Sequence, residues 1–218
     1  MNEVRGFAVA GATGRVGRHV VDVLRAAGHD VVPISRSSGV DVITGEGLEA
    51  ALAGVECVID TATGPSPEQG PATEFFTTAA RNLQETGARA GVQRIVTVSI
   101  IGCDRFSGGY GAAKVAHEEA ALAGPLPASI LRAAQFHEFV EQLIDWGRQG
   151  DVSYVPSMRT QLVAARTVAE ALVQLADDAP RRRHRRSFRR SPAHARSDSP
   201  RWHDCSSLDG TTQWRSRR

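Results

Sequence analysis

Short apolar runs and segments with helical periodicity alternate along the chain from residue 6 to about residue 178. The apolar runs are rich in valine and isoleucine, which is typical of strands buried on both faces. The strands predicted in this way are Phe7–Ala10, Val31–Ser35, Val55–Asp60, Arg94–Ile100 and Ala128–Arg132, with weaker candidates at Val40–Ile43, Val152–Val155 and Gln161–Ala164. The predicted helices are Gly14–Ala27, Gly47–Ala53, Thr73–Ala90, Ala112–Ala123, Glu138–Arg148 and Val168–Ala176.

Regular alternation of strands and helices predicts the α/β class, because parallel strands need a helical crossover between them. Right-handed crossovers place the helices on both faces of the sheet. We therefore expect a doubly wound parallel sheet of the Rossmann-like kind, and we assign residues 1–178 to this one domain.

The formal net charge of +2 is divided unevenly along the chain. Residues 1–179 hold 14 basic and 21 acidic residues, which gives −7, whereas residues 180–218 hold 12 basic and 3 acidic residues, which gives +9. The acidic part gives no reason to expect nucleic acid as a partner, because such partners need a basic surface. Twenty-five of the 26 basic residues are arginine, and Lys114 is the only lysine.

Residues 179–218 break the alternation and are expected to form a disordered basic tail in place of the fold's C-terminal part. Their only large aliphatic or phenylalanine side chains are Phe188 and Leu208, which cannot build a core. Three interpretations remain open: an arginine-rich arm that binds nucleic-acid phosphates, a solvated tail, or an out-of-frame translation product. The abrupt change in composition just after Asp178 favours the third.

The three cysteines, Cys57, Cys103 and Cys205, are widely scattered and show no metal-ligand spacing, so we expect no metal site and no disulfide framework. No apolar run reaches the length needed to cross a membrane, and no secretory signal follows Met1. These features predict a cytoplasmic protein with no membrane contact.

A glycine loop follows the first predicted strand and opens the first predicted helix. Its residues are Gly11, Ala12, Thr13, Gly14, Arg15, Val16 and Gly17. Glycines at this spacing allow a sharp turn, a close approach of the backbone to a pyrophosphate, and tight packing of the helix on the strand. The helix N-terminus then faces the anion. A plain glycine-rich turn is the alternative, but the position between strand and helix favours dinucleotide binding.

Arg36 lies at the end of the second predicted strand, where a carboxylate would select NAD by binding the adenosine ribose. Positions 34–38 contain neither Asp nor Glu. A guanidinium here can pair with a 2′-phosphate, which favours NADP over NAD; a solvated surface arginine is the alternative.

Tyr110 and Lys114 are four residues apart at the start of a predicted helix, so both side chains lie on one face. We expect the ammonium to lower the pKa of the phenol and so to let Tyr110 exchange a proton near neutral pH. Ser99 ends the fourth main strand, at the sheet edge where ligands bind in such folds, and its hydroxyl can hold a substrate carbonyl. A solvated Tyr–Lys pair is the alternative.

The glycine loop, Ser99 and the Tyr110-xxx-Lys114 spacing together resemble the short-chain dehydrogenase/reductase superfamily, in its extended or atypical NmrA-like NAD(P)-binding branch. The resemblance covers roughly residues 5–178 and implies that Tyr110 is the proton donor, that Lys114 tunes it and binds the nicotinamide ribose, and that Ser99 orients the carbonyl. It further implies that Thr61, Ala62 and Thr63 lie along the cofactor and that Gln135 and Phe136 flank the nicotinamide or substrate.

Three functional hypotheses follow. The first is an NADP-dependent oxidoreductase that transfers hydride to or from a carbonyl or hydroxyl substrate, with Tyr110 as acid/base. The second is a non-catalytic NADP redox sensor that regulates a partner protein, as in some atypical members of the branch. The third is a nucleic-acid binder that acts through the basic tail. The sequence identifies neither the small-molecule substrate nor the oligomeric state. We expect His117, Glu118 and Glu119 to form a solvated helix face and Cys57 to be a small core residue.

Overall fold

The computed structural model describes residues 4–156, 161–177, 184–188, 205–208 and 211–215. The chain divides into two compact units. The first comprises Met1–Ala133 and Ala165–Phe188, and the second comprises Ala134–Ala164 and Arg189–Arg218.

The first unit is built on one parallel sheet. Its strands are β1 (Gly6–Ala10), β2 (Asp30–Ile34), β3 (Cys57–Asp60), β4 (Arg94–Ile100), β5 (Ala128–Ala133) and β8 (His184–Phe188). They lie in the order β2-β1-β3-β4-β5-β8, and every neighbouring pair is parallel. The sequence order therefore reverses beside β1, as expected for a doubly wound sheet.

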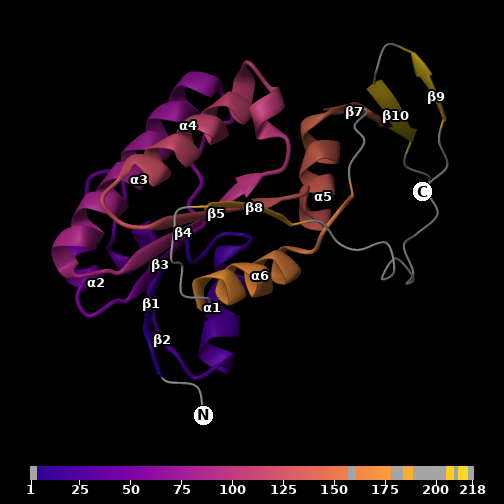
Figure 1. Ribbon diagram of the computed structural model, residues 1–218. Coiled ribbons are helices and arrows are strands. Elements are labelled where there is room, and N and C mark those ends of the chain that lie inside the picture. The colour runs from indigo at the N-terminus through magenta and orange to yellow at the C-terminus, as the bar shows by residue number, and fades with distance from the viewer. Residues whose placement is uncertain (1–3, 157–160, 178–183, 189–204, 209–210, 216–218) are drawn as a thin grey trace. The chain divides into compact units, whose positions relative to one another are not determined.

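Helices cover both faces of this sheet. They are α1 (Gly17–Ala26), α2 (Leu48–Leu52), α3 (Gln69–Ala90), α4 (Gly109–Ala123) and α6 (Ala165–Asp177), with short 3-10 turns η1 (Arg36–Ser38) and η2 (Cys103–Arg105). Helices α2, α3 and α4 lie on one face, and α1 and α6 lie on the other (Figure 1). The predicted α/β class and Rossmann-like architecture are confirmed.

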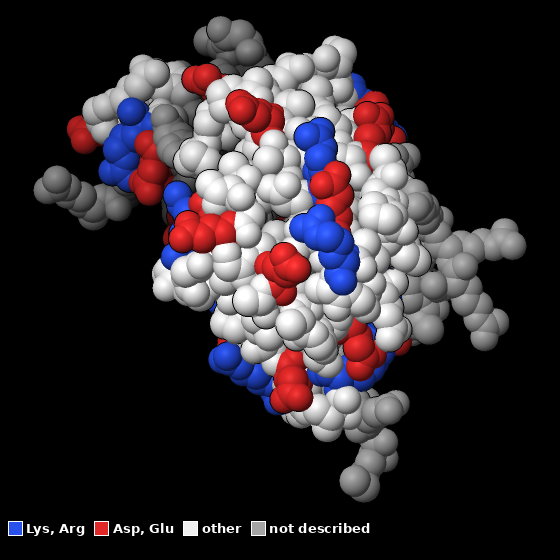
Figure 2. Space-filling view, turned by 90° about the vertical axis from the view of Figure 1, so that its left-hand side faces the viewer, with Lys and Arg blue, Asp and Glu red and all other residues white. Residues whose placement is uncertain are grey.

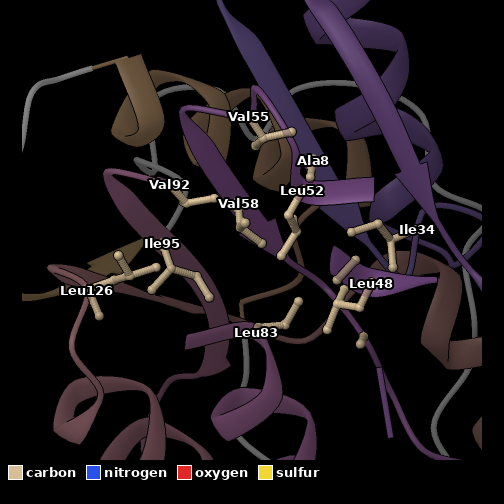
Figure 3. Packing of buried hydrophobic residues seen from close by; sticks show 13 residues of the cluster. Ala8, Ile34, Leu48, Leu52, Val55, Val58, Leu83, Val92, Ile95 and Leu126 are labelled. Atoms are coloured by element: carbon tan, nitrogen blue, oxygen red, sulfur yellow. The ribbon is translucent and has the colours of Figure 1, made fainter. Parts of the chain in front are cut away.

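A buried apolar cluster fixes α2 and α3 against the sheet. Strand residues such as Ala8, Val58 and Ile95 point toward Leu52 of α2 and Leu83 of α3 (Figure 3). All five are at most 1% exposed. Burying a leucine, isoleucine or valine side chain contributes about 1.5–3 kcal/mol, so this layer supplies much of the driving force that holds α2 and α3 on the sheet.

The weak strand predicted at Val40–Ile43 is wrong, because a turn forms there. The Asp41 carboxylate accepts hydrogen bonds from the amides of Ile43 and Thr44, at 2.7 and 3.4 Å. The Asn82 amide of α3 donates to two carbonyls of the segment, each at 2.8 Å. Asp side chains compete in this way with ladder bonds, and the partner Asn82 is too distant in sequence to be anticipated.

Three helix boundaries also differ from expectation. Helix α3 begins at Gln69, since Pro71 is tolerated in a first turn. Helix α1 begins only at Gly17, because the preceding residues form the glycine loop. Helix α4 begins at Gly109, which places Tyr110 inside its first turn.

Two arginines hold the C-terminal end of α6 in the first unit. The Arg94 Nε atom donates to the Ala176 carbonyl at 2.9 Å from a buried position. Arg5 forms an ion pair with Asp177. Cations at a helix C-terminus complement its partial negative charge. The two arginines therefore fix the end of α6 to the amino-terminal ends of β1 and β4.

The second unit contains α5 (His137–Trp146) and a sheet with the order β6-β7-β10-β9. Its strands are β6 (Arg148–Gln149), β7 (Val152–Pro156), β9 (Cys205–Leu208) and β10 (Thr211–Arg215). The strand predicted at Gln161–Ala164 is reduced to a single bridge between Phe136 and Val163. Gln135 and Phe136 belong to this unit, so their predicted place beside the nicotinamide stays a prediction.

Within residues 179–218 the structure describes only the strands β8, β9 and β10, and the rest lies outside the described residues. Disorder and an out-of-frame origin of this segment therefore stay predictions. On the face that Figure 2 shows, the described basic and acidic side chains are interspersed. Among the described helices, none is both long and apolar enough to span a bilayer.

Candidate cofactor and catalytic site

The glycine loop packs its own backbone against the end of β3. Gly11 has a φ of +74°, and a Cβ there would lie 2.8 Å from the Cα of Ala62. A Cβ on Gly17 would lie 2.1 Å from the Gly11 carbonyl oxygen and 2.7 Å from the Thr61 hydroxyl. A Cβ on Gly14 would meet only the Gly11 carbonyl oxygen, at 3.1 Å, so the space around this position is otherwise open. Glycine is thus required for the turn and for the contact between helix and strand.

We expect Gly17→Ala to lower the free energy of unfolding by about 1–3 kcal/mol, because the new methyl group would overlap fixed backbone. Urea unfolding of the full chain measures this. Gly70→Ala in α3 is the matched control, since a Cβ there meets nothing within 4 Å. Alanine in an open helical position should be neutral or stabilising. Equal stabilities of the two variants would contradict the assigned packing role of Gly17.

The N-terminus of α1 is suited to an anion. Its N-cap residue, Val16, contributes no side-chain hydrogen bond, and the first turn contains no acidic residue. Thr13, Gly14 and Arg15 are exposed beside it. An open helix N-terminus next to an exposed arginine attracts a phosphate group, so these residues fit the pyrophosphate of a dinucleotide.

The segment Thr61–Thr63 lies beside the glycine loop. The Thr61 hydroxyl donates to the Ala10 carbonyl at 2.7 Å, and the Ala62 amide donates to the Asp60 carboxylate at 3.0 Å. Thr63 is exposed. The expected position of these residues along a bound cofactor is compatible with this geometry.

Arg36 lies in η1, directly after β2, and is exposed. It lines a surface cavity of about 270 Å³ together with Gly39, Val40, Asp41 and Glu46. The turn is held locally, because the Ser35 amide donates to the Ser38 hydroxyl at 3.0 Å. The guanidinium is thus presented at the carboxyl edge of β2, where a 2′-phosphate would need it.

Tyr110 is positioned by three neighbours at the start of α4. The Gly109 amide donates to the Gln69 side-chain oxygen at 2.8 Å, which fixes the first turn. The Tyr110 ring meets the Phe76 ring edge to face, at 5.7 Å. Burial raises the pKa of the phenol, and a hydrogen bond with the Thr63 side chain partly opposes this rise. The expected lowering of the pKa by Lys114 is wrong in direction, because burial dominates.

Lys114 is only 4% exposed, and its ammonium is directed into the protein. Nζ donates to the Val98 carbonyl at 2.9 Å and lies 2.8 Å from His117 Nδ1. It also lies 4.3 Å from the centre of the Phe76 ring, within cation–π range. Burial lowers the pKa of Lys114 to about 8, against the opposing charges of Asp60, Glu118 and Cys103.

The predicted solvated face of α4 is wrong for His117 and Glu118, which are 1% and 0% exposed; only Glu119 is exposed. His117 Nε2 lies 2.8 Å from Asp60 Oδ2, and the imidazole stacks on Phe76 at 4.7 Å. Burial lowers the pKa of His117, and the Lys114 charge lowers it further.

Ser99 is buried beside a second polar group of residues. Its hydroxyl oxygen lies 3.8 Å from Cys103 Sγ, and Sγ in turn donates to Glu118 at 3.4 Å. Arg132 donates to both carboxylate oxygens of Glu118, each at 2.8 Å, and pairs with Asp104 at 3.0 Å. The role of Ser99 toward a carbonyl stays a prediction, since the described contacts of its hydroxyl are to protein groups.

Asp60, His117 and Glu118 were therefore missed as parts of the site. One signal was available: Lys114, His117 and Glu118 are three and four residues apart, which places them on one face of a helix. The face is buried because α4 packs against both α3 and the sheet. Its polar residue types instead predict an exposed face. Cys57 is a buried core residue, as expected, and burial raises its pKa to about 12.

Comparisons with known proteins agree with this geometry. The family model described as NAD(P)H-binding matches residues 11–179. No curated protein sequence matches the chain. Among solved structures, the chain is similar to MoeE5 in complex with UDP-glucose and NAD, with 21% identity and a TM-score of 0.69 over 84% of this chain and 75% of that one.

Two further structures show the same fold. One is the enzyme WbmH of Bordetella bronchiseptica in complex with NAD+, with 18% identity and a TM-score of 0.67 over 86% of this chain and 76% of that one. The other is a putative NAD-dependent epimerase/dehydratase from Bacillus halodurans, with 19% identity and a TM-score of 0.65 over 84% and 92%. The family match over residues 11–179, together with the glycine loop and the sheet order, places this chain in the NAD(P)H-binding family.

Proposed function

We propose that the chain is an NADP-dependent oxidoreductase of the short-chain type, in which Tyr110 moves a proton to or from the oxygen of a carbonyl or hydroxyl substrate. The observation that carries the proposal is the position of Tyr110. The Thr63 side chain acts on the phenol and lowers its pKa, and Thr63 belongs to the segment after β3 whose residues Thr61 and Ala62 contact the glycine loop. The proton donor and the cofactor-binding backbone thus share one edge of the sheet.

The bound nicotinamide would supply or accept the hydride, and the residues of this chain would hold it and handle the proton. Gly11, Gly14 and Gly17 shape the turn for the pyrophosphate, and Thr61–Thr63 border the rest of the cofactor. Because burial raises the pKa of Tyr110, the phenol stays protonated at neutral pH. A protonated phenol suits donation to a developing alkoxide in carbonyl reduction, and the phenolate formed is the matching base for the reverse reaction.

Arg36 is expected to select NADPH over NADH. A titration of the full chain with NADPH and another with NADH, each monitored by nicotinamide fluorescence, measure this preference. Losing a charge-assisted contact to the 2′-phosphate in Arg36→Ala should weaken NADPH binding by about tenfold or more and leave NADH nearly unchanged.

Arg81→Ala in α3 is the control for that titration, because Arg81 is also an exposed arginine but lies in the body of a helix. Equal losses for both cofactors in Arg36→Ala, or tighter binding of NADH to the unmodified chain, would count against the NADP assignment. Oxidation of NADPH over a panel of small aldehydes and ketones tests the oxidoreductase assignment itself.

A redox sensor without turnover is the second candidate, and one observation favours it. The Lys114 ammonium is engaged by protein groups, whereas the family resemblance assigns it to the nicotinamide ribose. A sensor would bind NADPH tightly, oxidise it with no carbonyl of the panel, and change its affinity for a protein partner with the redox state of the cofactor.

A further inference from the structure

The only lysine of the chain is the end of a buried row of three ionisable side chains, Lys114, His117 and Asp60. We propose that His117, anchored by Asp60, is a positioning residue that holds the Lys114 ammonium in place one helical turn from Tyr110. The proposal deepens the proposed oxidoreductase function and rests on it for the purpose that Lys114 serves.

The ammonium has three N–H donors, and each has a protein partner within reach. One is the Val98 carbonyl at 2.9 Å, the second is His117 Nδ1 at 2.8 Å, and the third is the face of Phe76 at 4.3 Å. These partners come from β4, α4 and α3. The side chain is therefore held from three directions.

The contacts of His117 require its neutral form with the proton on Nε2. Nδ1 must accept from the Lys114 ammonium, so Nε2 carries the hydrogen that it donates to Asp60 Oδ2 at 2.8 Å. The Phe76 ring lies nearly parallel to the imidazole, at an interplanar angle of 19°. Neighbours on both ring nitrogens and on a ring face leave the imidazole one orientation.

Asp60 supplies the charge that makes a buried ammonium tolerable. Burial would raise the pKa of this carboxyl, but the hydrogen bond from His117, together with the Ala62 amide and the Lys114 charge, holds it below its ordinary value. A buried charge is costly unless it is balanced and hydrogen-bonded. The neutral imidazole therefore bridges an anion and a cation.

The Asp60 end of the row lies next to Thr61–Thr63, the segment expected along the cofactor. Asp60 Oδ1 accepts from the Ala62 amide at 3.0 Å, and the side chain of Thr63, one residue further, lowers the pKa of Tyr110. The same three-residue segment thus connects the end of the row with the proton donor. Loosening His117 should affect Lys114 and, through Asp60, the segment beside the cofactor.

Other ionisable groups face the row. Glu118 on α4 and Cys103 in η2 act on Lys114, and Glu118 also acts on His117. Arg132 of β5 pairs with Glu118 through two hydrogen bonds and supplies its counter-charge. Removing Asp60 should therefore change the pKa of Lys114 more than removing any of the other anions named above.

A single lysine makes the test direct. The full chain, labelled with 13C at the lysine ε-carbon, should give one lysine side-chain signal in NMR, and its chemical shift against pH reports the protonation of Lys114. We expect a midpoint of about 8 in the unmodified chain, well below that of an exposed lysine.

Asp60→Asn removes the balancing anion, and His117→Phe keeps a ring against Phe76 but has no acceptor for Nζ. Each change should lower the midpoint by about one pH unit. Glu119→Gln is the matched control, since it removes an exposed carboxylate from the same helix and should leave the midpoint unchanged.

A midpoint near that of an exposed lysine in the unmodified chain, or no change in the two variants, would overturn the proposal. If Asp60→Asn fails to fold, the unmodified chain and His117→Phe decide. The NADPH assay is read separately. A shifted midpoint without carbonyl turnover contradicts the proposed function alone, and turnover with an ordinary midpoint contradicts the positioning role alone.

Discussion

Tyr110→Phe is expected to lower NADPH-dependent carbonyl reduction by about 10²- to 10⁴-fold, the usual contribution of a positioned proton donor. The phenyl ring keeps the edge-to-face contact with Phe76, so the fold and the glycine loop should be undisturbed. NADPH affinity should therefore stay within about twofold of that of the unmodified chain. Stopped-flow or steady-state oxidation of NADPH at 340 nm over the carbonyl panel measures the rate.

The second tyrosine of the chain provides the control. Tyr154 lies on β7 and is 38% exposed, so Tyr154→Phe removes the same hydroxyl group from a site without a proposed chemical role. It should leave the rate unchanged. Equal rates for the unmodified chain and Tyr110→Phe would remove Tyr110 as the proton donor.

The pH dependence of the reduction rate is a second test of Tyr110 as the proton donor. Burial raises the pKa of Tyr110, so the donor form persists through neutral pH and is lost only above the ordinary phenol value of about 10. The Tyr110-dependent rate of reduction should therefore be flat near neutrality and fall in strong base. A rate that falls as pH rises through 7 would instead indicate the lowered pKa first expected from the Tyr–Lys spacing.

The parts of the site that local sequence determines could be predicted. The glycine loop is one, because Gly11 and Gly17 are required by contacts of the turn with its own strand and helix. The Tyr110–Lys114 spacing is another, because helical geometry alone places both on one face. The doubly wound parallel sheet could be predicted in the same way, from alternating strands and helices joined by right-handed crossovers.

The environment of those residues could not be predicted, because it depends on distant parts of the chain. Lys114 is directed inward by Val98 and Phe76, neither of which is a sequence neighbour. His117 is buried because Asp60, 57 residues earlier, accepts its hydrogen bond. A polar residue on a helix is usually exposed, and only tertiary packing reveals that this face of α4 is a buried polar row.

Arg132→Met is expected to lower the free energy of unfolding by about 3–5 kcal/mol, a large share of the stability of an ordinary domain. Arg132 is 13% exposed at its side chain and binds both oxygens of Glu118, whose side chain is 0% exposed. Methionine fills much of the volume but leaves the buried Glu118 carboxylate without this counter-charge. Arg132 also pairs with Asp104, so the change releases η2 from β5 as well.

Urea unfolding of the full chain measures this loss, and an exposed ion pair provides the comparison. Arg166 and Glu170 in α6 lie 3.3 Å apart with side chains 56% and 52% exposed, so Arg166→Met should cost at most about 0.5 kcal/mol.

The hydrogen bonds from Arg132 and Ser99 hold the pKa of Glu118 below its ordinary value despite burial. The stability that Glu118 gains from this pairing is fully present above the unfolded pKa of about 4.3 and is lost as pH falls through the folded value. The difference between the unmodified chain and Arg132→Met should therefore be constant near neutrality and shrink in acid. Losses of similar size for Arg132→Met and Arg166→Met would show that the Arg132–Glu118 pair contributes no more than a surface contact.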